Sequence, residues 1–198
     1  MDTTTTAYLN RIGVEAEQPS TQALARLHRA QVERVAYETF WIHLDEGWTI
    51  DPAESLRRIA YERRGGYCFQ VNGALALVLR DLGYRVGWHV AGVHNDTGAN
   101  LGNHVALIVE DLPSDTNVGG RWYVDAGLGD VLHEPVPLVS GLYPQGPTLF
   151  ALAAGGAADW HLTASSGGVS IVDRAVPLST FAARHEYNST SPASSFAR

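Results

Sequence analysis

Apolar residues in the first third of the chain recur at the spacing of amphipathic helices. In the segment that follows Ser20, one helical face carries Leu24, Leu27, Gln31 and Val35. Ser20 is a residue type that caps helix N-termini, because its hydroxyl accepts a hydrogen bond from a free backbone N–H. We therefore predict a helix that begins just after Ser20.

Two further helices are expected before Tyr84. Asp51 and Pro52 join a capping carboxylate to a proline at the first helical position. The buried face of that helix consists of Leu56, Ile59 and Ala60. The next helix has the clearest pattern, with apolar residues at Val71, Leu75, Val78 and Leu82. It ends at Gly83, which suits a left-handed C-terminal cap, and begins close to Cys68, after the break at residues 65–66.

From Tyr84 onward the helical spacing gives way to alternation, which is typical of strands. Residues 86–90 alternate apolar with small or polar side chains, and residues 104–109 form a compact apolar run. A polar turn at 113–120 then leads into residues 121–125, so we predict a β-hairpin. Short strands are also expected at 149–152 and 169–172, and a short helix at 180–184.

These elements predict an α+β fold with two parts. Residues 1–84 are expected to form a helical domain, an N-terminal helical bundle that carries Cys68. Residues 85–198 are expected to form a β-rich domain, either an antiparallel β-barrel or a sheet.

Composition and charge narrow the classes of function. The 198 residues carry a formal net charge of −7, and Lys and Arg never gather into a dense run, so nucleic-acid binding has no electrostatic footprint. No apolar run is long enough to span a bilayer. The N-terminus lacks the basic start and apolar middle of a secretory signal, so we expect a cytoplasmic protein. Cys68 is the single cysteine, which excludes an intramolecular disulfide and makes a zinc site unpromising.

Cys68 is the first candidate for chemistry. A lone cysteine is more often a small buried hydrophobic residue than a nucleophile. Its place in the first turn of a predicted helix favours the nucleophile, because free backbone N–H groups and the helix dipole stabilise a thiolate. The same N–H groups could bind an oxyanion. Arg63 and Arg64 lie just upstream and would either assist the thiol or pair with acids.

His104 and Asp125 are the matching candidates for a base and for the group that orients it. His104 begins one strand of the predicted hairpin and Asp125 ends the other, so the hairpin would bring them side by side. Each residue alone has a plainer explanation, a hydrogen-bonded core histidine for His104 and a turn or cap for Asp125. Together with Cys68 they predict a Cys-His-Asp site on an α+β protein.

Five segments resemble motifs of the arylamine N-acetyltransferase family, in the family's order along the chain. Residues 64–72, RGGYCFQVN, closely resemble the family signature RGGYCFE-x-N. Residues 104–109, HVALIV, look like its catalytic-histidine strand, and residues 123–129, YVDAGLG, are similar to its YLVDVGFG segment. Weaker likenesses join residues 35–40 to IPFENL and residues 188–196 to N-x-x-T-x-P-x-S-x-F.

The resemblance implies specific roles. Cys68 would be the acyl-accepting nucleophile, His104 the base and Asp125 the orienting acid. The activity implied is a ping-pong transfer of an acetyl group from acetyl-CoA to an arylamine or hydrazine, without a metal, on a cysteine core like those of papain and transglutaminase. Neither nucleic acid nor a membrane would be a partner, and self-association stays open.

The resemblance also implies binding residues. Gly127 and Gly129 would form a turn that lets the cofactor approach the backbone, although the residues alone favour a tight bend after a strand. Tyr37 and Phe196 would line the acceptor pocket, whereas core packing is the plainer explanation for both.

Two departures from the family pattern keep other functions open. Family members usually continue into a C-terminal α/β lid that contributes to the CoA cleft, and this chain ends at Arg198; Gln70 also stands where Glu is usual. The alternatives are an amide synthase of natural-product assembly that uses a carrier-bound acyl group, a thiol peptidase or thioester hydrolase, and a non-catalytic remnant.

Overall fold

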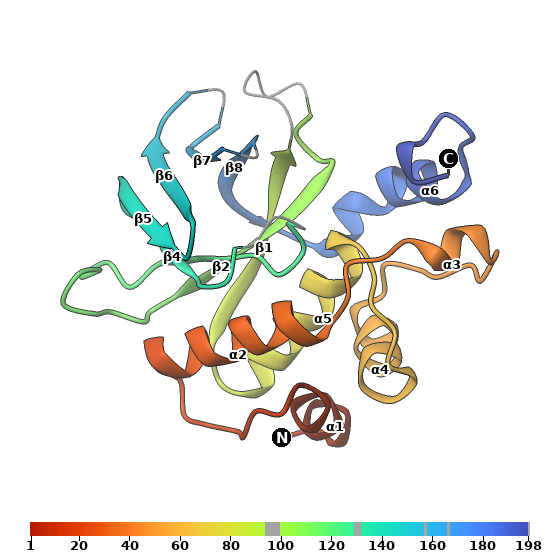
Figure 1. Ribbon diagram of the computed structural model, residues 1–198, viewed down its shortest axis with the longest axis horizontal. Coiled ribbons are helices and arrows are strands. Elements are labelled where there is room, and N and C mark those ends of the chain that lie inside the picture. The colour runs from red at the N-terminus through yellow and green to blue at the C-terminus, as the bar shows by residue number, and fades with distance from the viewer. Residues whose placement is uncertain (94–99, 129–131, 157, 166, 198) are drawn as a thin grey trace.

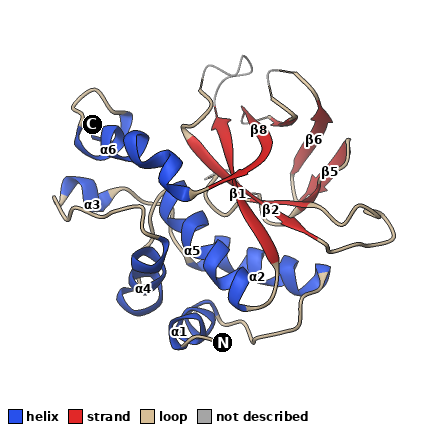
Figure 2. Cartoon of the chain, turned by 180° about the vertical axis from the view of Figure 1, so that it is seen from behind, coloured by secondary structure: helices blue, strands red, loops and turns tan. Residues whose placement is uncertain are grey.

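The computed structural model describes residues 1–93, 100–128, 132–156, 158–165 and 167–197. Most of its helices lie on one side of the molecule and its strands on the other (Figures 1 and 2). The C-terminal helix α6 lies beside the short helix α3, at the edge of the helical part. No helix among the described residues is both long enough and apolar enough to cross a membrane.

The N-terminal helices are α1 (Thr3–Ile12), α2 (Thr21–Arg34), α3 (Phe40–His43), α4 (Pro52–Glu62) and α5 (Cys68–Asp81). The predicted helix starts are confirmed. The side chain of Ser20 accepts a hydrogen bond from the Ala23 N–H at 3.1 Å, and Asp51 accepts one from Ala53 at 2.9 Å. Gly83 has φ of 94° just after α5, as the left-handed cap requires.

Helix α1 is an element that the hydrophobic pattern does not single out. Its first turn is a run of threonines, which are β-branched and weak helix formers. Asp2 compensates by capping the N-terminus, where its carboxylate accepts a hydrogen bond from the Thr4 N–H at 2.7 Å. Tyr8 and Ile12 then bury the helix against the core.

Within the described residues, eight antiparallel strands form one curved, nearly closed sheet in the order β4-β3-β2-β1-β8-β7-β6-β5. They are β1 (Arg85–Val93), β2 (His104–Glu110), β3 (Trp122–Val124), β4 (Val136–Pro137), β5 (Gly141–Gln145), β6 (Thr148–Ala154), β7 (Trp160–Ala164) and β8 (Gly167–Val176). The predicted hairpin is confirmed as β2 and β3, where Leu107 faces Val124. The strands expected at 149–152 and 169–172 fall within β6 and β8.

The chain ends in three short helical elements, η1 (Leu178–Phe181), α6 (Ala182–Thr190) and η2 (Ser195–Ala197). The helix predicted at 180–184 therefore exists, but it continues further than the pattern indicates. Leu178 and Phe181 are buried and pack with the residues around Cys68, so this last segment closes over the start of α5.

Helix α5 is the centre of the molecule. Every residue from Cys68 to Ala76 is buried, with α4 on one side and β1 and β2 on the other. One hydrophobic core joins α1, α2, α4 and α5 to β2 and β3. A second cluster of aromatic rings surrounds the start of α5, where Trp41 stacks on Trp48 at 5.7 Å and on Tyr67 at 6.1 Å between ring centroids. The position of Cys68 is thereby fixed from all sides.

The turn before α5 depends on close backbone contact at Gly65. Residues 65–66 run beside residues 36–38, with a bridge between Tyr37 and Gly66. The Gly66 N–H donates to the Ala36 carbonyl oxygen at 3.3 Å. A Cβ on Gly65 would lie 1.9 Å from that same oxygen. Only glycine therefore lets these two segments meet, which brings Tyr37 toward the start of α5.

We predict that Gly65→Ala destabilises the fold, because the new methyl group would overlap a backbone atom that cannot turn aside. The expected loss in the free energy of unfolding is about 1–3 kcal/mol, measured by urea denaturation. Gly119→Ala is the matched control, since the nearest atom to its Cβ is 3.9 Å away. Equal midpoints for the two variants would contradict this account of the turn.

Candidate active site

Cys68 is the first residue of α5, and its side chain is almost fully buried. Tyr67 precedes it in an extended conformation, and no described side chain caps this helix. The Gln70 N–H donates to the Tyr67 carbonyl oxygen at 3.0 Å, and the remaining N–H groups of the first turn have no side-chain cap among the described residues. The Cys68 thiol lies 4.0 Å from the carbonyl oxygen of Asn103, which brings the sulfur next to the start of β2.

His104, the first residue of β2, lies between Cys68 and Asp125. Its Nε2 donates to Oδ2 of Asp125 at 2.6 Å, and both side chains are buried. Burial alone lowers the pKa of His104, but the charges of Asp125 and Cys68, and hydrogen bonds to both, raise it to about 10. The structure thus brings together the three residues that the sequence singles out.

The carboxylate of Asp125 is buried directly after β3 and receives four hydrogen bonds. His104 and the Tyr123 hydroxyl donate to Oδ2. Asn72 donates to Oδ1 at 2.8 Å, and the Gly127 N–H does so at 2.9 Å. Burial raises the pKa of Asp125, but the charge of His104 and these hydrogen bonds outweigh it and lower the pKa below its usual value. Asp125 therefore stays ionised inside the protein.

The sequence motifs alone give no role to Asn72 or Tyr123, although the position of each is informative. Asn72 follows Cys68 by one helical turn, so the two share a face of α5. Tyr123 precedes Asp125 by two residues, which places both side chains on the same side of a strand. Asn72 also donates to the Val105 carbonyl oxygen at 2.8 Å and accepts from the Ala126 N–H at 3.0 Å. It therefore ties α5 to β2 and to the turn after β3.

A further contact comes from His28 on α2, which the sequence does not mark. Its Nε2 accepts a hydrogen bond from the backbone N–H of Asp125 at 3.3 Å. Its Nδ1 donates to the carbonyl oxygen of His133 at 3.0 Å. His28 is fully buried, and this burial lowers its pKa. No local pattern could link it to a residue 97 positions away.

Gly127, which is expected to let a cofactor approach the backbone, is in close contact with Cys68. A Cβ at Gly127 would lie 2.6 Å from Cα of Cys68, so the turn after β3 packs directly on the nucleophile candidate. Its expected contact with a cofactor stays a prediction. Gly129, the other glycine assigned to this role, lies outside the described residues.

Arg64 and Gln70 lie close to Cys68 in the sequence, and the structure shows what each side chain contacts. Arg64 pairs with Glu46 at 2.9 Å and with Glu38 at 3.5 Å, so it serves an ion-pair network at the surface. Gln70, at the position where the family usually has Glu, is buried and donates to the Thr49 carbonyl oxygen at 3.4 Å.

A small cavity of about 160 Å³ opens beside Cys68 and His104. Tyr37 and Phe196, the two residues expected in an acceptor pocket, both line it. Tyr37 is 43% exposed and is therefore not a core residue, whereas Phe196 packs on Tyr67 with ring centroids 5.0 Å apart. Arg184 of α6 also lines the cavity, and no Asp or Glu is among its described lining residues.

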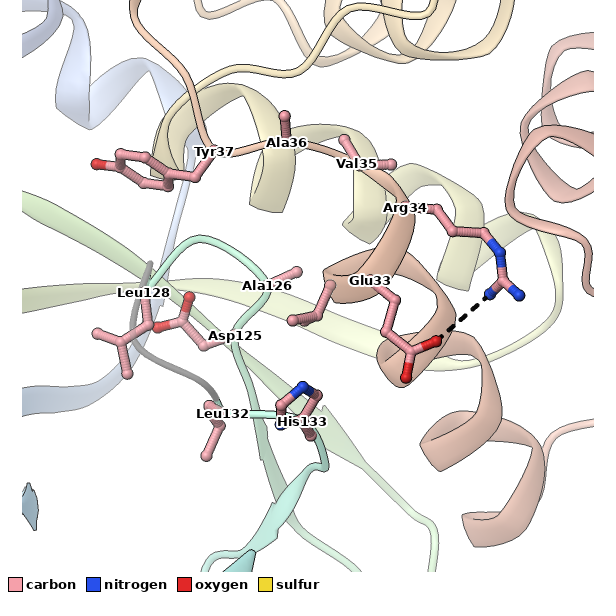
Figure 3. A pocket seen from close by; sticks show the side chains of 11 residues that line it. Glu33, Arg34, Val35, Ala36, Tyr37, Asp125, Ala126, Leu128, Leu132 and His133 are labelled. Atoms are coloured by element: carbon pink, nitrogen blue, oxygen red, sulfur yellow. Dashed lines mark ion pairs between the residues drawn. The ribbon is translucent and has the colours of Figure 1, made fainter. Parts of the chain in front are cut away.

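A larger cavity of about 460 Å³ adjoins the first (Figure 3). It lies between the end of α2 and residues 125–128 and 132–133. Tyr37 and Leu128 line both cavities, so the turn after β3 borders each of them. Glu33 and Arg34 form an ion pair at 3.8 Å at its edge.

A family model, curated relatives and solved structures all point to the same protein family. A family model described as N-acetyltransferase matches residues 20–198. Arylamine N-acetyltransferase 1 of Oryctolagus cuniculus is 33% identical over 165 residues, which are 79% of this chain and 54% of that protein. The arylamine N-acetyltransferase / N-hydroxyarylamine O-acetyltransferase of Salmonella typhimurium is 29% identical over 131 residues, which are 65% of this chain and 45% of that protein. The chain thus spans about half the length of the curated relatives that it matches.

Solved structures agree over the whole described fold. Arylamine N-acetyltransferase from M. tuberculosis has a TM-score of 0.85 at 27% identity, covering 100% of this chain and 74% of that one. The Mycobacterium marinum arylamine N-acetyltransferase in complex with CoA has a TM-score of 0.84 at 25% identity, covering 97% and 73%. With the family model spanning residues 20–198, these likenesses establish that the chain belongs to the arylamine N-acetyltransferase family.

Proposed function

We propose that this chain transfers an acetyl group from acetyl-CoA, through Cys68, to the nitrogen of an arylamine or hydrazine. The observation that carries the proposal is the buried, hydrogen-bonded series of Cys68, His104 and Asp125 at the N-terminus of α5. The names of the relatives support the class of acceptor, and the M. marinum complex supports CoA as the donor.

The first half of the reaction forms an acyl-enzyme. The Cys68 thiolate attacks the thioester carbonyl, and the N–H groups of the first turn of α5 stabilise the oxyanion. The tetrahedral intermediate collapses with loss of the CoA thiolate, which takes the proton from the imidazolium of His104. Asp125 keeps His104 in the orientation and charge state that this step needs.

The second half passes the acetyl group to the amine. The amine nitrogen attacks the Cys68 thioester while neutral His104 accepts the proton that the nitrogen loses. Collapse of this intermediate breaks the C–S bond and restores the thiolate beside an imidazolium. The nucleophile stands on a helix, and its partners stand on β2 and directly after β3, which also supports the proposed likeness to papain and transglutaminase cores.

Hydrolysis is the nearest competing reaction, because an acyl-enzyme reacts with water as well as with amines. Cys68 is only 3% exposed, so few water molecules reach the sulfur. This burial favours transfer over hydrolysis. An amide synthase that takes its acyl group from a carrier protein would use the same three residues. Comparing acetyl-CoA with a carrier-bound acyl group as donors distinguishes it from an acetyltransferase.

Mixing the protein with acetyl-CoA should add one acetyl group to Cys68, seen by intact mass spectrometry and peptide mapping. An arylamine should then remove the group faster than buffer alone and appear as the N-acetyl product. Cys68→Ala should abolish both the adduct and the product. Product formation by this variant at the wild-type rate would falsify the acyl-enzyme route, and loss of the adduct at equal rates with and without amine would indicate a hydrolase.

The protonation state of the pair can be tested without any acyl donor. Because Asp125 raises the pKa of His104, the imidazolium persists through neutral pH and supports the thiolate. Asp125→Asn removes the charge, so the pKa of His104 falls and the sulfur loses its charged neighbour near neutral pH. We expect alkylation of Cys68 by iodoacetamide to slow at least about tenfold near neutral pH. Asp173→Asn, at a carboxylate paired with Arg121, should leave the profile unchanged.

Arg184 makes an anionic ring substituent on the acceptor favourable. It lines the cavity beside Cys68, and its guanidinium carbon lies 5.2 Å from the ring centroid of Tyr187. Arg184→Met should lower kcat/KM for 4-aminobenzoate about two- to fivefold, the size expected for an exposed ion pair. The kcat/KM of this variant for the methyl ester of the same amine should equal that of the wild type. Arg174→Met, on β8, is the control and should leave kcat/KM for both substrates unchanged. Equal losses for acid and ester would show that Arg184 does not recognise charge.

A further inference from the structure

We propose that His28 is a positioning residue that fixes the backbone at Asp125 and thereby aims its carboxylate at His104. The proposal rests on the role proposed above for Asp125. His28 belongs to α2, makes no contact with the candidate substrate cavity, and has no part in the proton transfers of the reaction.

The imidazole of His28, on α2, bonds the backbone at two residues that follow β3, Asp125 and His133. Its Nε2 accepts from the Asp125 N–H at 3.3 Å, and its Nδ1 donates to the His133 carbonyl at 3.0 Å. Figure 3 shows Asp125 and His133 beside α2, with Ala126 and Leu128 between them in sequence. His28 therefore bonds Asp125, two residues before the Gly127 that packs on Cys68, and also bonds His133.

These two bonds require one particular form of the ring. Nε2 must be unprotonated to accept from an N–H, and Nδ1 must carry the proton to donate to a carbonyl. A charged imidazolium would point an N–H at the N–H of Asp125. Burial lowers the pKa of His28 and outweighs the nearby charge of Asp125 and the backbone hydrogen bonds, which raise it, so the ring stays neutral.

The remaining contacts of the turn do not replace this one. The Asp125 carboxylate is held by Asn72, Tyr123 and Gly127, but its backbone N–H is satisfied by His28. The next amide, Ala126 N–H, donates to Asn72 of α5. Two successive amides are thus fixed by two different helices, and loss of His28 leaves one of them buried and unpaired. The backbone would then shift to find a partner, and the carboxylate would move with it.

The test compares His28→Leu with His28→Gln by the pH profile of Cys68 alkylation with iodoacetamide. Leu supplies neither hydrogen bond, so we expect alkylation near neutral pH to fall about tenfold and the profile to move to higher pH. Gln carries both an acceptor and a donor, so it should recover most of the wild-type rate. His89→Leu is the matched control, because His89 is also buried but bonds the Val172 carbonyl in the sheet. It should lower the melting temperature without moving the profile.

The outcomes separate this inference from the proposed function. A folded His28→Leu variant with the wild-type alkylation profile would overturn the positioning role and leave acetyl transfer untouched. A wild-type protein whose Cys68 alkylates rapidly but takes no acetyl group from acetyl-CoA would overturn only the proposed function. If His28→Leu does not fold, ¹⁵N NMR of the wild-type imidazoles decides. A neutral His28 with the proton on Nδ1 supports the inference, and a proton on Nε2 overturns it.

Discussion

The whole arrangement depends on keeping one negative charge, that of Asp125, inside the protein. A buried carboxylate is costly unless hydrogen bonds and an opposite charge replace the water that it loses. Here the replacements come from α5, β2, β3 and the turn that follows β3. Every one of these elements must therefore be in place before the charge is tolerated. Folding of the sheet against α5 and assembly of the site are the same event.

Helix α5 links that charge to the sulfur. Cys68 and Asn72 lie one turn apart, so the helix sets their separation whatever happens at the surface. The aromatic cluster of Trp41, Trp48 and Tyr67 packs around the helix start, and His185 bonds Tyr67 and the Trp48 carbonyl from the C-terminal segment. Distant parts of the chain thus converge on the first turn of α5. Rigid placement there is what lets a thiol, an imidazole and a carboxylate meet with little reorganisation.

Local patterns in the sequence predicted the elements that have local causes. The caps at Ser20 and Asp51 and the spacing along α5 each depend on neighbours within a few residues. The hairpin of β2 and β3 then brought His104 to Asp125, because antiparallel pairing leaves little freedom of register. By contrast, the pairing of β1 with β8 and the bond from His28 to Asp125 join residues far apart in sequence. Such contacts follow from the packing of whole elements, and no periodicity encodes them.

Two buried histidines in this site illustrate why burial alone does not set a protonation state. His28 and His104 are both almost completely enclosed, yet the pKa of the first is lowered and that of the second is raised. The bonds of His28 run to a backbone N–H and a backbone carbonyl, which demand a neutral ring. His104 bonds a carboxylate, whose charge favours the imidazolium. The same residue type thus has a neutral ring at one position and favours a charged ring at the other, and the hydrogen-bond partner decides which.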